Sequence, residues 1–287
     1  MRGQRHLLLW ALGLSLLPSV AWADAEIEGC PPWCPVPHEP TTTVSPHAKG
    51  RWWPGFAMRS YSLRVSDERS RIGTDDRTAG SVGLEERSLN YLSLGKWSAR
   101  YTDFIAFGGG NAGVDGGAGM DGAIGFKPLV GPGHGPLLRL GVRAHWYYRA
   151  HFHTSILELP QAQVGYSFIG RRLHLEAAAR GGPVLTGRYG VDGGAVTRLD
   201  NSLEVGGYVS FGLRPVRLDV EASRVRLGGV SGPVDSLDAL LCGTLAKPIV
   251  CFHGSALRGT LGSRSGSQLG TATYVGVTIG YGPVEWR

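Results

Sequence analysis

Apolar and polar residues alternate strictly over residues 138–149 of this chain. The apolar set is Leu138, Leu140, Val142, Ala144, Trp146 and Tyr148, and the intervening set is Arg139, Gly141, Arg143, His145, Tyr147 and Arg149. Successive side chains of a β-strand leave opposite faces of the sheet, so this period of two predicts a strand with one oily and one cationic face. Such a strand suits either a soluble β-sandwich or a membrane barrel whose apolar face contacts lipid.

The same alternation recurs in ten segments of the chain, and we expect ten strands. Their apolar positions lie at 61–65, 92–94, 105–107, 120–126, 138–148, 164–168, 173–179, 203–213, 216–222 and 275–281. The chain contains 45 glycines in 287 residues, well above the usual share of about 7%. Because glycine disfavours helices, an all-β protein rich in turns is the expectation.

The connections between the expected strands are alternately short and long. The short ones are 95–99, 130–136, 169–171 and 214–215, and the three longest are 66–86, 181–201 and 228–270. The loops at one end of the sheet are therefore short, and those at the other end are long. The third long loop contains Cys242 and Cys251 and an apolar patch from Leu237 to Leu245, which we expect to form a short helix or a contact surface.

The first 55 residues differ from the rest of the chain. Arg2 and Arg5 precede an apolar run, and Ala21-Trp22-Ala23 is typical of a cleavage site, so residues 1–23 are predicted to be a signal peptide. Residues 24–55 are rich in proline and are predicted to be a periplasmic linker. No later segment has about 18 consecutive apolar residues, so the sequence predicts no transmembrane helix.

With its signal peptide, its ten alternating strands and its uneven loops, the chain resembles the small outer-membrane β-barrel proteins of Gram-negative bacteria. The resemblance is one of architecture and covers about residues 56–283. It implies a closed antiparallel up-and-down transmembrane barrel of about ten strands over residues 56–287, located in the outer membrane, with short periplasmic turns and long extracellular loops. Such barrels commonly end on an aromatic assembly signal, for which Tyr281 and Trp286 are the candidates. A soluble sandwich, the alternative, does not explain the loop asymmetry.

In this barrel the polar positions of the strands would face the lumen. The candidates are Arg139, Arg143, His145, Arg172, His174, Glu176, Glu204, Arg217, Asp219 and Glu221. A small barrel has a narrow interior that side chains can fill, so we expect the arginines to pair with carboxylates. Small residues on the same face, such as Gly206 and Ser210, would leave free space beside the arginines. The alternative to a filled interior is therefore a narrow channel with a cationic lumen.

Catalytic and metal-binding patterns are incomplete. Asp75-Asp76 supplies the paired carboxylates of a protease site, but the Asp-x-His that would complete it does not occur in the chain. His153-Thr154-Ser155 offers the residue types of a lipid acyl hydrolase, but adjacent residues of a strand point to opposite faces. Neither the histidines at 145, 151 and 153 nor the set Cys30, Cys34 and His38 has a complete ligand set. The segment 116–124, GGAGMDGAI, holds one copy of a calcium-binding repeat that works only when stacked, and we expect a flexible loop there. We expect no catalytic residues, no metal and no cofactor.

The remaining features concern partners. The net charge is +6 without a block of like charges, which argues against nucleic-acid binding. The four cysteines fall into two local pairs, Cys30 with Cys34 and Cys242 with Cys251, and an exported chain would form both disulfides. The sequence predicts a non-enzymatic scaffold surrounded by outer-membrane lipid, whose extracellular loops contact an unidentified ligand. A narrow solute channel and a hydrolase at the rim, of the protease or lipid acyl hydrolase kind, are the alternatives.

Overall fold

The computed structural model describes residues 53–94, 96–111, 113–128, 134–148, 152–169, 173–191, 202–226, 232–244, 248–263 and 266–286. The predicted signal peptide, most of the predicted linker and the pair Cys30 and Cys34 fall outside these residues and stay predictions. No helix in the described part of the chain is long and apolar enough to cross a bilayer.

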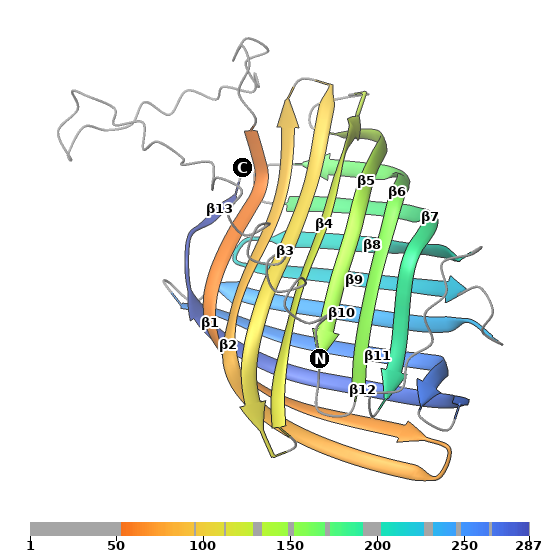
Figure 1. Ribbon diagram of the computed structural model, residues 1–287. Coiled ribbons are helices and arrows are strands. Elements are labelled where there is room, and N and C mark those ends of the chain that lie inside the picture. Colours follow the sequence, from red (N-terminus) through yellow and green to blue (C-terminus); the bar gives the residue numbers. More distant parts are fainter. Residues whose placement is uncertain are drawn as a thin grey trace, which may run out of the picture. The chain divides into compact units, whose positions relative to one another are not determined.

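The described residues form one β-sheet that closes on itself (Figure 1). Its strands are β1 (Trp53–Ile72), β2 (Asp75–Leu94), β3 (Trp97–Gly110), β4 (Gly113–Phe126), β5 (His134–Tyr148), β6 (Phe152–Ile169), β7 (Leu173–Val191), β8 (Leu203–Leu213), β9 (Val216–Arg226), β10 (Val234–Thr244), β11 (Pro248–Ser263), β12 (Gly266–Tyr281) and β13 (Val284–Trp286). Each strand from β1 to β12 pairs antiparallel with its sequence neighbours, and β12 pairs with β1, for example Tyr281 with Tyr61. The short β13 continues beyond β12 along the start of β1.

The closed up-and-down barrel is confirmed, but the expected number of ten strands is wrong, because β1 to β12 make twelve. The two missing strands, β10 and β11, occupy the predicted loop 228–270. Both have apolar residues on their inner face as well as on their outer face. Leu240 and Ile249 point inward and are buried, while their neighbours Leu241 and Val250 lie on the outer face. This blurs the period of two, and the expected short helix in this segment is also wrong.

The described parts of the other two long loops are largely strand as well. Residues 66–86 form the outer ends of β1 and β2, joined by a two-residue turn in which Gly73 has a φ of 58° that suits glycine. β7 continues to Val191, well into the predicted loop 181–201. A transmembrane strand needs only about 9–11 residues, so the 20 residues of β1 extend past the membrane. There both faces are polar, which removes the alternation that reveals a strand.

The outer face of the barrel is apolar and the inner face is polar. Leu63 and Val205 are 52% and 59% exposed, whereas their neighbours Arg64 and Glu204 are 2% and 0% exposed. A soluble sandwich would bury the apolar face instead. Lipid requires every backbone amide to be paired and leaves no place for an open sheet edge, and the closed ladder meets both conditions. The alternation therefore reflects a transmembrane barrel.

The glycine-rich segment 116–124, expected to be a flexible loop, lies within β4. Its inward glycines make room for aromatic rings of the two flanking strands: Phe104 of β3 and Tyr147 of β5 stack with ring centroids 4.8 Å apart. A Cβ at Gly119 would come within 2.5 Å of the Phe104 ring, and one at Gly117 within 2.8 Å of the Tyr147 ring. Glycine is needed here because the rings cover the strand, as in designed sheets where aromatic residues cover glycines.

Candidate functional site inside the barrel

A buried ion pair joins the inner faces of β5 and β7. Arg139 donates from Nη1 and Nη2 to the two carboxylate oxygens of Glu176, at 2.6 and 3.0 Å. The Tyr208 hydroxyl also donates to Glu176, at 2.7 Å. The side chains of Arg139 and Glu176 are only 2% and 1% exposed. Bidentate pairs of this kind are strong and fix the orientation of both groups, so protein fills this part of the lumen.

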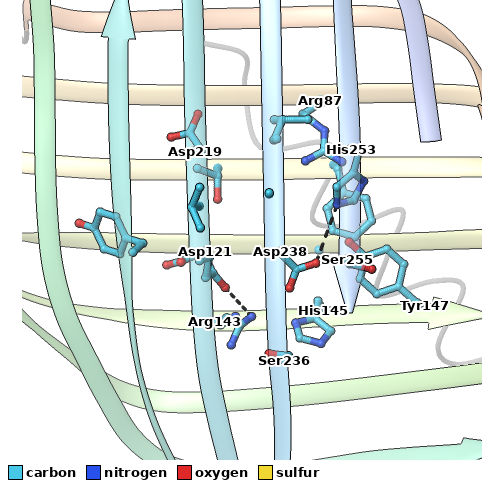
Figure 2. A pocket seen from close by; sticks show the side chains of 18 of the residues that line it. Arg87, Asp121, Arg143, His145, Tyr147, Asp219, Ser236, Asp238, His253 and Ser255 are labelled. Atoms are coloured by element: carbon cyan, nitrogen blue, oxygen red, sulfur yellow. Dashed lines mark hydrogen bonds and ion pairs between the residues drawn. The ribbon is translucent and has the colours of Figure 1, made fainter. Parts of the chain in front are cut away.

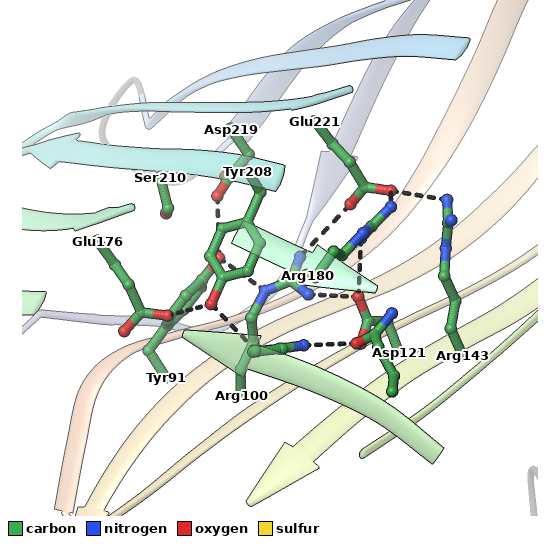
Figure 3. Close-up of polar contacts among 12 residues, drawn as sticks. Tyr91, Arg100, Asp121, Arg143, Glu176, Arg180, Tyr208, Ser210, Asp219 and Glu221 are labelled. Carbon is green, nitrogen blue, oxygen red and sulfur yellow. Dashed lines mark hydrogen bonds and ion pairs between the residues drawn. The ribbon is translucent and has the colours of Figure 1, made fainter. Parts of the chain in front are cut away.

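A larger charged network crosses the lumen beside this pair (Figure 3). Its members are Arg100, Asp121, Arg143, Arg180, Glu204 and Glu221. Arg180 lies at the centre, 3.4 Å from Asp121 and 3.2 Å from Glu204, and it also contacts Glu221. Each of the three carboxylates contacts more than one arginine, so the six side chains form one connected unit contributed by strands β3, β4, β5, β7, β8 and β9.

Arg217 connects the charged interior to the apolar periplasmic end. Its guanidinium lies 4.0 Å from the ring centroid of Phe56 and 4.4 Å from that of Tyr91, an arrangement that favours cation–π attraction. It also donates twice to Asp219, at 2.7 and 2.8 Å. The Tyr91 hydroxyl donates to the same carboxylate at 3.2 Å. The charge of this arginine is therefore neutralised within the lumen.

An apolar cluster lies inside the barrel at the end that carries the short turns, where β1 begins and β12 ends. Its members are Phe56, Met58, Leu89, Tyr91, Leu240, Cys242, Ile249 and Cys251. Cys242 and Cys251 are directly paired residues of β10 and β11 and form a disulfide, as their spacing predicted. Its expected position in an extracellular loop is wrong, because both side chains point inward at the periplasmic end.

A second apolar cluster narrows the outer end of the lumen. It contains Ile156, Val184, Val225, Val234 and Ala272, with Ile72 and Leu257 packed against it. Near this end β7 and β11 also pair directly, at Gly190 and Gly262. These two strands extend beyond the shorter β8, β9 and β10 that separate them in the sheet. Apolar side chains thus gather near both ends of the lumen.

A cavity of about 190 Å³ lies in the lumen (Figure 2). Its lining includes His145, His253, Asp238 and Ser255. His253 Nε2 is 3.8 Å from Asp238 Oδ1, and the His253 ring meets the edge of the Tyr274 ring at 5.1 Å. Among the described residues, no cluster of three or more His, Cys, Asp or Glu side chains is arranged to hold a metal ion. Polar and apolar side chains share this lining, and the polar ones offer hydrogen-bond partners to water or a small polar solute.

The sequence-predicted lumenal residues with described side chains all lie on the inner face. These are Arg139, Arg143, His145, His174, Glu176, Glu204, Arg217, Asp219 and Glu221. Arg172 lies outside the described residues. The structure places Asp75 and Asp76 at the exposed outer tip of β2, where Asp75 is 3.6 Å from Arg77. The side chain of His153 is outside the described part, so the proposed rim site stays untested.

Several central members of the network were missed by the sequence analysis. Arg100 and Arg180 occupy the same phase of alternation as the predicted lumenal residues, and this phase could have revealed them. Asp121 was hidden in the glycine-rich segment expected to be a loop. Tyr208 alternates in step with Glu204 and Ser210 of β8, which face the lumen. A tyrosine is common on either face of a barrel, so this alternation alone does not mark Tyr208 as a member of the lumenal site.

No protein-family model matches the sequence, and a search of curated proteins found no match. Solved structures similar to the chain include an anion-selective porin from Comamonas acidovorans, with 10% identity and a TM-score of 0.37 over 81% of this chain and 100% of that one. Outer membrane phospholipase A from Escherichia coli has 11% identity and a TM-score of 0.38 over 77% and 92%. The outer membrane protease OmpT from Escherichia coli has 9% and 0.34 over 79% and 96%.

The class of the protein follows from the barrel itself. A closed antiparallel sheet with an even number of transmembrane strands, an apolar outer face and a charged interior defines a β-barrel of the outer-membrane type. The chain is therefore an outer-membrane protein. The similar structures are a porin, a phospholipase and a protease, so they share no single activity.

Proposed function

We propose that this chain is a non-enzymatic scaffold of the outer membrane with a closed lumen. The observation that carries the proposal is the pairing of charges in the lumen: the buried arginines of the network and its neighbours each have a carboxylate partner, namely Arg100, Arg139, Arg143, Arg180 and Arg217. A pore that attracts anions needs cationic side chains facing water. Here their charge is balanced by carboxylates and their surface is covered by protein.

The function of a closed barrel lies on its surface. The long outer ends of β1 and β2 carry charged side chains on their outer face beyond the apolar belt, including Asp67, Arg69 and Arg71, and Arg69 and Asp67 approach to 3.5 Å. This hairpin supports a contact with a ligand outside the cell, whose identity the chain does not specify. Outer-membrane lipid is the other partner, and the proposal includes no nucleic acid and no cofactor.

Planar-bilayer recording tests the proposal. The full mature chain, checked for folding by heat-modifiable gel migration, is expected to give no conductance steps. A double variant, Arg139→Ser with Glu176→Ser, removes both partners of the central pair and should produce small steps, which shows that the assay detects an opened lumen. The matched control Arg224→Ala with Asp235→Ala removes an exposed pair on the outer face and should stay silent.

A second candidate, a narrow solute channel, is favoured by the cavity beside His145 and His253. In this case the cavity would be the central part of a solute pathway that also passes the apolar clusters at the two ends of the lumen. Wild-type chain would then conduct, and replacement of Arg139 and Arg143 by Ser would change that conductance and its ion selectivity. Steady conductance of the wild type would contradict the closed scaffold.

A further inference from the structure

Polar side chains interrupt the apolar belt on the outer face of β1, β2 and β3. We call this group the outer polar patch; it consists of Arg59, Glu86, Asn90, Tyr101 and Asp103, together with Ser88, which has the same phase but is covered by its neighbours and only 7% exposed. Its outward direction follows from the alternation. On β2, Glu86 has the same phase as Val82 and Leu84, which are 54% and 52% exposed, whereas Glu85 between them is buried.

The outer polar patch lies at the depth of the hydrocarbon, and not at the edge of the barrel. Along β2 its residues are followed on the periplasmic side by Leu92 and Leu94 and on the outer side by Leu84. Along β3 they lie between Trp97 and Phe107, which are 54% and 58% exposed. Apolar residues therefore flank the patch on both sides along the direction that crosses the membrane.

Contacts within one chain satisfy the outer polar patch only in part. Arg59 donates from Nε to Glu86 Oε1 at 2.8 Å and from Nη2 to the same oxygen, and its guanidinium lies 5.3 Å from the Tyr61 ring centroid. The Tyr101 hydroxyl interacts with the Asp103 carboxylate. The side chains of Arg59 and Glu86 nevertheless remain 42% and 31% exposed. These charges face whatever surrounds the barrel.

The rest of the belt shows what faces lipid in this protein. Asp103 of β3 pairs with Met120 of β4, which in turn pairs with Ala144 of β5. Neither of these two outward-facing neighbours carries a charge. On the opposite wall, Val209 and Val220 are directly paired on the outer face. Charged groups on a lipid-facing surface are unfavourable, and most so near the bilayer midplane. A protein surface is therefore a better neighbour for the outer polar patch than lipid.

We propose that the outer polar patch is the contact surface for a second copy of this chain. Ser88 of β2 pairs with Arg59 of β1 on one side and with Asp103 of β3 on the other, so opposite charges flank β2 in one row. A two-fold axis along the membrane normal in front of β2 places β1 of each copy against β3 of the other. Arg59 of one copy then lies opposite β3 of its partner, the strand that carries Asp103, and this happens twice in each dimer. This self-complementarity is what an isologous contact requires.

The proposal goes beyond the scaffold function and does not depend on whether the lumen conducts. Cross-linking tests the geometry in liposomes that contain the full mature chain with Cys30→Ser and Cys34→Ser. Asn90→Cys places a thiol on β2 near the axis, and a short bismaleimide should join two copies of it efficiently. The matched control Val220→Cys carries a thiol on the outer face of β9, on the opposite wall, and should give little cross-linked product.

Charge reversal tests the chemistry. Asp103→Lys places like charges opposite each other in the dimer, and lost or reversed close charge pairs typically change the Kd by about tenfold or more. Sedimentation equilibrium in detergent should show that loss of association. The control Val209→Lys adds a lysine to the outer face away from the patch and should leave the dimer unchanged. Heat-modifiable migration verifies that each variant is folded.

Three outcomes would overturn the proposal. The first is a wild-type chain that sediments as a monomer at every concentration. The second is equal cross-linking of Asn90→Cys and Val220→Cys, which indicates random encounters. The third is a dimer that Asp103→Lys leaves intact. A folded monomer would point to a different membrane protein as the occupant of the outer polar patch.

Discussion

Arginine–carboxylate pairs occur on both faces of the barrel wall, and the two sets differ in what surrounds them. Inside, Arg139 and Glu176 are enclosed by neighbouring side chains, and the Tyr208 hydroxyl provides a further hydrogen bond. Outside, Arg59 and Glu86 have the same chemistry on a face that otherwise contacts lipid. The difference teaches that a charge pair at membrane depth belongs to the fold of one chain where protein surrounds it, whereas on the lipid-facing side it indicates a missing neighbour.

The largest effect is expected from breaking the inner pair. Glu176→Ala leaves the Arg139 guanidinium buried without its carboxylate, and loss of one partner of a buried pair typically costs about 3–5 kcal/mol. Urea unfolding in liposomes, followed by tryptophan fluorescence, measures this change. The double variant Arg139→Met with Glu176→Leu should recover most of the loss, because no charge is left buried. Equal loss in both variants would contradict the role given to the unpaired charge.

The outer pair should respond in the opposite direction. Arg59→Leu with Glu86→Leu extends the apolar belt, and an arginine near the midplane of a barrel's lipid face typically costs about 2–4 kcal/mol. Because the two charges partly offset each other, we expect the free energy of unfolding of the monomeric barrel to rise by about 2 kcal/mol, the lower end of that range. The same unfolding experiment applies, at a protein-to-lipid ratio low enough to separate the copies. A destabilised monomer would show that the pair serves the fold of a single chain.

The smallest effect is expected from a pair at the outer edge of the belt. Arg224 donates to both carboxylate oxygens of Asp235, at 2.6 and 3.0 Å, but both side chains are well exposed. Exposed ion pairs are screened and contribute little. Arg224→Ala should therefore leave the unfolding midpoint without a resolvable shift. A clear shift of the unfolding midpoint would mean that an exposed pair on the outer face contributes to stability, contrary to this prediction.

The sequence predicts the barrel well where one face contacts lipid and the other is polar. In β5 the alternation of leucines and arginines reveals the strand, its faces and the lumenal position of Arg139. The signal fails where both faces have the same character. In β10 and β11 the inner face is apolar because it forms the periplasmic cluster, and at the outer ends of β1 and β2 both faces are polar.

The site is harder to predict than the fold. Alternation says that Arg100, Arg139 and Arg180 point into the lumen, but the pairing of each arginine with its carboxylate depends on the barrel's circumference and on the stagger of its strands. With twelve strands instead of ten, the residues that face each other across the lumen change. The outer polar patch needs the register of three strands, since only the pairing of Ser88 with Arg59 and Asp103 brings its members together.

Closure between β1 and β12 also bears on how the protein reaches its native state. The ladder from Tyr61–Tyr281 to Ile72–Gly270 joins β1 to β12, so the seam cannot form until the chain has been delivered as far as β12. Contacts between such distant segments are slow to form, because the entropy of closing the intervening chain is lost before they are made. Until then two strand edges remain open, and a chain that lacks β12 has no means of pairing them as the full barrel does. Assembly of this barrel is therefore decided at its last step, by residues at its C-terminal end.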